Sequence, residues 1–215
     1  MERQAVLSAG ELYRELYKAY GRPPWWSQDP FTVMFQAVLV QNTAWSSVQK
    51  ACAALGEVPS AQAVLALPVE EVENMARPCG FYKAKVRAIR ALAVWYGGYG
   101  FERRAVQAQP LKKLRGELLN IKGVGAETAD VILLYAFYQP AFVVDAYTRR
   151  LLGRLGLDLK NDGEVRAYFE AGLPRSARHY GWCHWLLLEH GIAFCRKRPR
   201  CAACPLRAAC AQRLK

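Results

Sequence analysis

Four cysteines near the C-terminus have the spacing that points most directly to chemistry. They form a C-x5-C-x2-C-x5-C pattern over Cys195, Cys201, Cys204 and Cys210. Four thiolates on one short loop bind either zinc or a [4Fe–4S] cluster. Structural zinc sites usually use two closely spaced cysteine pairs, and only Cys201 and Cys204 form such a pair. We therefore expect a metal centre on residues 195–210, with its type open on spacing alone.

A second candidate site is the stretch NIKGVGAETADVILLYAF, which begins at Asn120. Gly123 and Gly125, on either side of Val124, can adopt positive φ and leave N–H groups accessible before a helix expected from Ala126. Such donors, with the helix dipole, suit a phosphate oxygen. Positive charge nearby comes from Lys112, Lys113, Arg115 and Lys122. An ordinary helix–helix connection with a glycine C-cap would have the same pattern, so both interpretations stay open.

An aspartate interrupts an apolar stretch twenty residues further on, in AFVVDAYTRRLLGRLG. Asp145 directly precedes a predicted helix, so an N-cap is the ordinary explanation. Taken together with the hairpin, Asp145 also has a role beyond capping open to it. The two roles are compatible.

Together these residues resemble the helix-hairpin-helix DNA glycosylases. Members of that family share a Gly-Val-Gly hairpin and a downstream aspartate in a Val-Asp context. The resemblance extends to AVLVQNTAWSSVQKA, to CGFYKAKVRAIRAL and to the cysteine segment, which is similar to the iron–sulfur segment of endonuclease III. It implies that Asp145 is catalytic and that the four cysteines hold a [4Fe–4S] cluster, although the first gap is one residue shorter than is typical of endonuclease III.

The resemblance also implies which residues contact DNA. The hairpin supplies Lys122, Gly123, Val124 and Gly125, and Gln41 matches a residue that fills the gap left by a flipped base. The run RKRPR inside the cysteine loop offers four cations to the DNA backbone, Arg196, Lys197, Arg198 and Arg200. His184 and His190 are interpreted as packing residues or phosphate contacts, because their spacing does not place them on one helix face.

Glu127 predicts which reaction the site performs. In bifunctional family members a lysine two residues after the second hairpin glycine attacks the sugar and forms a Schiff base. This chain has Glu127 there, and a carboxylate cannot form an imine. We therefore expect a monofunctional glycosylase in which water is the nucleophile and Asp145 stabilises the positively charged sugar.

Aromatic residues point to the class of damaged base. Trp25, Trp26 and Trp45, with Glu127, are expected to line a base pocket, and they resemble the 3-methyladenine DNA glycosylase III branch. Indole faces attract cationic rings. Alkylated purines such as 3-methyladenine are therefore the expected substrates. Two alternatives remain: a bifunctional, endonuclease III-like glycosylase and lyase acting on oxidised pyrimidines, and a catalytically inactive DNA-binding protein.

Composition and helix patterning provide the framework. The 215 residues include 30 Lys and Arg against 18 Asp and Glu, a net charge of +12 that favours a polyanionic partner, either nucleic acid or an anionic membrane. The resemblance implies that this partner is double-stranded DNA with a damaged base. No apolar run is long enough to span a membrane, so a cytoplasmic, nucleoid-associated monomer is expected. Helical periodicity predicts an all-α fold. The resemblance implies two helical domains with a DNA-binding cleft between them. The expected domains are residues 22–134, with the hairpin at 111–137, and residues 1–21 plus 135–215, with the cluster loop at 195–210.

Overall fold

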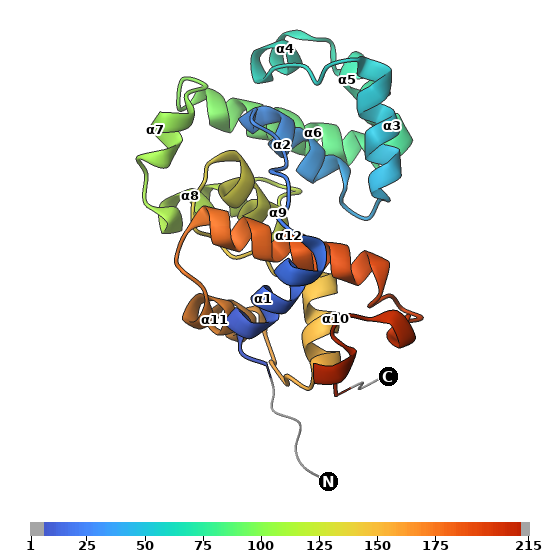
Figure 1. The fold of residues 1–215 in the computed structure, drawn as a ribbon. Helices are drawn as coiled ribbons and strands as arrows, with labels where there is room; N and C mark the ends of the chain where they lie inside the picture. The colour runs from blue at the N-terminus through green and yellow to red at the C-terminus, as the bar shows by residue number, and fades with distance from the viewer. Residues whose placement is uncertain (1–6, 212–215) are drawn as a thin grey trace. The chain divides into compact units, whose positions relative to one another are not determined.

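The computed structural model describes residues 7–211, and every regular element in that range is helical, as predicted (Figure 1). The helices form two compact units. Unit 1 combines Met1–Trp25 with Phe142–Lys215, and unit 2 comprises Trp26–Ala141. The described residues before Trp26 and after Ala141 therefore belong to one unit, and the hairpin belongs to the other.

Unit 2 is built around α2, which begins at Pro30 behind the N-cap Asp29. Seven of its ten residues are buried, and it packs against α6, α9 and the π-helix η2. The unit contains α2 (Pro30–Leu39), α3 (Trp45–Leu55), α4 (Ala61–Ala66), α5 (Val69–Ala76), η1 (Arg77–Cys79), α6 (Tyr82–Gly97), α7 (Arg103–Gln107), α8 (Leu111–Leu119), α9 (Ala126–Val131) and η2 (Ile132–Ala136). An almost entirely apolar helix at the centre gives this unit its core.

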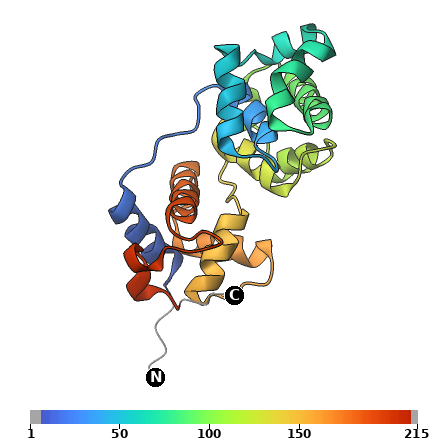
Figure 2. The ribbon, with the colours of Figure 1, turned by 90° about the vertical axis from the view of Figure 1, so that its right-hand side faces the viewer.

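Unit 1 packs α12 against α1 and α10, and α1 also contacts α11. Its helices are α1 (Ala9–Tyr20), α10 (Ala146–Leu155), α11 (Asp162–Gly172) and α12 (Ala177–Ala193), followed by the 3-10 turns η3 (Cys201–Ala203) and η4 (Arg207–Ala209). Figure 2 shows the loop that carries these turns, in dark red, following α12. Phe142 and Phe169 stack in the core with ring centroids 4.1 Å apart.

The division between the units falls at Trp26 and Ala141, whereas the sequence placed it at residues 22 and 134. The π-helix accounts for the later boundary, because Ile132–Ala136 continues α9 and packs on α2 inside unit 2. The outer ends of the expected second domain, residues 1–6 and 212–215, lie outside the described range. Within that range no helix has the length and apolar character that crossing a bilayer requires.

Candidate functional site

The hairpin consists of α8, a six-residue turn and α9. Gly123 has φ +96°, and a Cβ added there would lie 3.1 Å from the Cβ of Ala88, so glycine is required. The expectation of positive φ was wrong for Gly125, which is extended with φ −85° and ψ 177° and precedes the first residue of α9. It needs no unusual conformation because it serves as the N-cap. Val124 is buried and fixes the turn to the unit.

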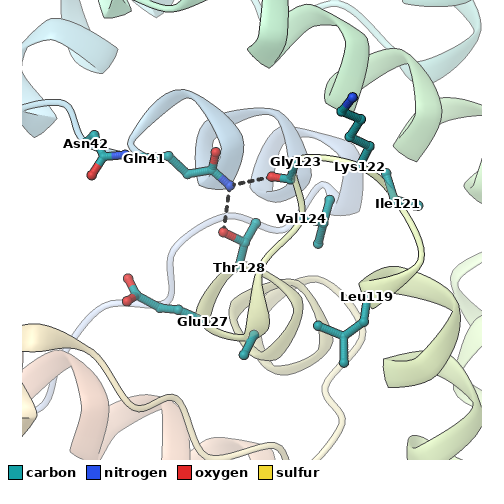
Figure 3. Close-up of a pocket in the computed structure, with 11 residues that line it drawn as sticks. Gln41, Asn42, Leu119, Ile121, Lys122, Gly123, Val124, Glu127 and Thr128 are labelled. Atoms are coloured by element: carbon teal, nitrogen blue, oxygen red, sulfur yellow. Dashed lines mark hydrogen bonds between the residues drawn. The ribbon is translucent and has the colours of Figure 1, made fainter.

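Gln41 links the hairpin to the end of α2. Its Nε2 donates to the carbonyl of Gly123 at 3.0 Å and to Oγ1 of Thr128 at 2.8 Å (Figure 3). The same residues line an open cavity of about 610 Å³, together with Asn42, Lys122 and Glu127. Gln41 is thus docked on the hairpin in this structure and does not extend into solvent.

The cations predicted around the hairpin divide into two kinds. Lys122 is exposed and points away from Gln41 (Figure 3). Arg115 instead forms a two-pronged ion pair with the buried Asp130, at 2.7 and 3.2 Å, and this pair joins α8 to α9. Arg115 therefore has a structural partner, and its expected contribution to phosphate binding is corrected to one of hairpin stability. Arg196, Lys197, Arg198 and Arg200 are all exposed on the cysteine loop.

The loop after α2 is held by a buried lysine. Lys85 is 5% exposed, and its ammonium group donates to the carbonyls of Leu39 and Cys79 and to Oγ1 of Thr43, each at 2.8 Å. Thr43 also donates to the carbonyl of Cys79 at 2.6 Å. These bonds join the Gln41–Thr43 loop to the turn before α6. There Phe81 lies 78% exposed in the left-handed region, with φ +47°.

Two of the three tryptophans expected in a base pocket contact each other. Trp26 donates from Nε1 to Gln36 at 2.7 Å and meets Trp45 edge to face, with ring centroids 5.6 Å apart. Its other edge-to-face neighbour is Tyr135 of η2. A base cannot fit between Trp26 and Trp45 in this arrangement, since stacking on both faces needs parallel rings about 7 Å apart. Trp45 is 41% exposed, and Trp25 is partly buried.

Asp145 is the N-cap of α10, so the ordinary interpretation of its position is correct. Its Oδ1 accepts from the amide of Thr148 at 2.7 Å, and the residue is 6% exposed. Glu127 is exposed in the first turn of α9. Asp145 belongs to unit 1 and Glu127 to unit 2.

His184 is a partner of Asp145 that the sequence did not reveal. Its Nε2 lies 3.6 Å from Oδ2 of Asp145, and both side chains are buried. Burial alone would raise the pKa of Asp145, but the contact with His184 and the hydrogen bond from the amide of Thr148 outweigh burial and lower that pKa. His184 and His190 are 5% and 1% exposed, so neither is available to phosphate, and the phosphate interpretation is wrong for both. Spacing misled because α12 is buried around most of its circumference.

The four C-terminal cysteines line one cavity in unit 1. Its remaining wall is largely apolar and includes Leu151, Phe194 and Leu206. The cysteine loop is tied to α10, because Arg150 donates to the carbonyl of Cys195 at 2.7 Å and Arg154 to that of Arg196 at 2.6 Å. Local turns thus bring four residues from a span of sixteen positions to a common centre.

The four cysteines are suitable ligands for a metal centre. Among residues 7–211, no three histidine, cysteine or carboxylate side chains are grouped closely enough to hold one metal ion. Burial raises the pKa of Cys204, and the other three thiols add to that rise. Bound metal would remove this mutual repulsion, so the four donors fit a thiolate-bound metal centre, a class that includes zinc and [4Fe–4S].

Comparison with known proteins identifies the family. Residues 35–175 match the model of the HhH-GPD superfamily base excision DNA repair proteins. A candidate DNA repair glycosylase of Methanocaldococcus jannaschii is 37% identical over 93% of this chain and 94% of its own length. Endonuclease III of Treponema pallidum is 33% identical over 93% of this chain and 92% of its own length.

Solved structures show the same fold. A trapped endonuclease III–DNA covalent intermediate matches with a TM-score of 0.75 and 27% identity, covering 94% of this chain and 93% of that one. The Helicobacter pylori 3-methyladenine DNA glycosylase bound to 1,N6-ethenoadenine matches with a TM-score of 0.74 over 86% of this chain and 98% of that one, and at 23% identity it supports the fold alone. The chain belongs to the HhH-GPD superfamily of base excision DNA repair glycosylases.

Proposed function

We propose that this chain is a monofunctional DNA glycosylase that hydrolyses the N-glycosidic bond of alkylated purines such as 3-methyladenine in double-stranded DNA. The observation that carries the proposal is the pair of acidic positions. A carboxylate, Glu127, occupies the place of the Schiff-base lysine, and a second carboxylate, Asp145, is buried at a helix N-terminus with a lowered pKa. The first excludes imine formation at that position, and the second remains ionised at neutral pH.

Asp145 would act on the sugar electrostatically. Breaking the bond between base and sugar places positive charge on the sugar ring. An ionised carboxylate stabilises that charge and orients or deprotonates the attacking water. Oδ1 is used by the cap, which leaves Oδ2 for this role. A base that already carries positive charge leaves most easily, which favours alkylated purines.

DNA would be held by three groups of residues. The hairpin supplies Lys122 and the amides around Gly123 and Gly125, and the cysteine loop supplies Arg196, Lys197, Arg198 and Arg200. These residues would contact the phosphates of the DNA backbone, so their binding would not depend on the base sequence. Gln41 would fill the gap left by the flipped base, and Trp25, Trp26 and Trp45 would bind that base, with Trp45 as the accessible face. A [4Fe–4S] cluster on the four cysteines would hold the loop in shape.

A second candidate is a glycosylase and lyase acting on oxidised pyrimidines, which the 33% identity to an endonuclease III favours. Duplexes that each carry one defined lesion separate the two. We expect excision of an alkylated purine, detected as strand cleavage only after alkali, and no covalent adduct with borohydride. An adduct, or strand cleavage without alkali, would establish the second candidate instead.

Asp145→Asn tests the mechanism and the non-enzymatic alternative together. Asparagine caps helices as well as aspartate does but carries no charge. We expect excision to fall by about 10²–10³, the usual effect of losing one preorganised electrostatic contact, while binding to the damaged duplex persists. Excision at the parent rate would refute the role of Asp145. A parent protein that binds every lesion and excises none would be the inactive binder.

A further inference from the structure

The two carboxylate oxygens of Asp145 have different partners. Oδ1 is bound by the amide of Thr148 at 2.7 Å, whereas Oδ2 faces Nε2 of His184 at 3.6 Å. That second distance is longer than an ordinary hydrogen bond, and the contact is an ion pair when the imidazole of His184 is protonated. Both side chains are less than a tenth exposed, at 8% and 7%, so solvent screens the contact little. His184 therefore acts on the oxygen that the helix cap does not use.

Other charged groups on the two helices have other partners. On α10, Arg149 pairs with Asp162, while Arg150 and Arg154 bind the cysteine loop. On α12, His179 binds Ser176, His190 binds Tyr20, Arg178 lies over Trp182, and Glu189 is exposed. The charge that acts on Asp145 is that of His184.

We propose that His184 is a positioning residue for glycosidic bond cleavage, which holds Oδ2 of Asp145 in place and keeps the carboxylate ionised. The inference rests on the proposed function, in which that oxygen stabilises the sugar. Burial by itself would raise the pKa of Asp145, and the contact with His184 is the foremost opposing cause. Without His184 that pKa would be higher, and a protonated carboxyl group cannot stabilise a cation.

Two substitutions of His184 separate the effect of its ring N–H group from the effect of its positive charge. His184→Gln retains an amide N–H near the position of Nε2 but cannot be positively charged, and His184→Leu removes both. The matched control is His179→Gln, which lies on the same helix and contacts Ser176. Excision would be measured under single-turnover conditions over an acidic-to-neutral pH series.

We expect the acid limb of the rate profile to move to higher pH by about one unit in both His184 variants and to stay in place in the control. At neutral pH, His184→Leu should lose about tenfold in rate and His184→Gln less, because the amide still positions the carboxylate. A side chain needed only for packing would lower the rate equally at every pH.

Carbon NMR of the Asp145 carboxyl group, assigned by its absence in Asp145→Asn, gives a readout that does not depend on activity. The carboxyl group should titrate at higher pH in both His184 variants. If both variants are folded and keep the parent titration and acid limb, the inference is wrong while the proposed function stands. If Asp145→Asn excises at the parent rate, the proposed function fails, and the NMR titration still reports whether His184 and Asp145 are coupled.

Discussion

Replacing the buried Lys85 with methionine should destabilise unit 2 and disturb the loop that carries Gln41. The ammonium group is the donor for three acceptors at 2.8 Å, two of them carbonyls at the ends of α2 and η1. Methionine fills a similar volume but donates no hydrogen bond. Burial lowers the pKa of Lys85, so removing the charge recovers part of the cost of burying it.

The size of the effect follows from the acceptors left without a donor. Thr43 still donates to the carbonyl of Cys79, so the carbonyl of Leu39 and Oγ1 of Thr43 are the two acceptors that lose their donor. An unsatisfied buried acceptor costs about 1–3 kcal/mol, and the recovered desolvation of the ammonium group places the net cost near the lower end for each, or about 2 kcal/mol in all. For a chain of this length, 1 kcal/mol corresponds to a change in melting temperature of roughly 2–4 °C. Lys85→Met should therefore melt about 6 °C below the parent protein.

Thermal melting followed by circular dichroism measures this directly. The matched control is Lys83→Met, because Lys83 is exposed two residues away on α6. Affinity for a duplex with an abasic site should also fall in Lys85→Met, since Thr43 and Gln41 lose their anchor. If Lys85→Met melts with the parent and the Lys83 control, the three bonds do not stabilise the fold and this reasoning is refuted.

Three further predictions follow from the remaining contacts. Asp145→Ala should lose about 1–2 kcal/mol of unfolding free energy through the missing cap, whereas Asp145→Asn should lose less than half of that; equal losses in urea denaturation would contradict the capping role. The pKa of Asp145 is lowered in the folded state, so the ionised carboxylate stabilises the fold at any pH above 3.8, the ordinary pKa of aspartate. This contribution to the free energy of unfolding should disappear as the pH falls below 3.8. The free energy of unfolding of Asp145→Asn should therefore depend less on pH in the acidic range, and parallel curves for the two proteins would count against the lowered pKa. Thr128→Val removes one hydrogen-bond acceptor of Gln41. If the contact of Gln41 with the hairpin competes with its insertion into DNA, this variant should bind a duplex with an abasic site more tightly, and adding Gln41→Ala should abolish the gain. An unchanged affinity in Thr128→Val would show that the two positions of Gln41 do not compete.

Local sequence was sufficient for the features that depend on neighbouring residues. Helical periodicity gave the helices, the Gly-Val-Gly stretch gave the turn between α8 and α9, and four cysteines within sixteen positions gave a cavity lined by all four. The Asp145 cap follows from one residue and the three after it. Positive φ was assigned to one glycine too many, because the pattern does not distinguish a turn residue from a helix N-cap.

Contacts between distant segments were decided only by the tertiary structure. Gln41 and Thr128 are 87 positions apart, and Lys85 and Leu39 are 46 apart. Asp145 meets His184 across two packed helices, α10 and α12. A period or a motif reports the preferences of adjacent residues, whereas such pairs depend on how whole helices pack. The sequence by itself therefore determined the helical class, the family and the candidate residues, and the packing of the helices decided which of those residues have buried partners and which remain exposed.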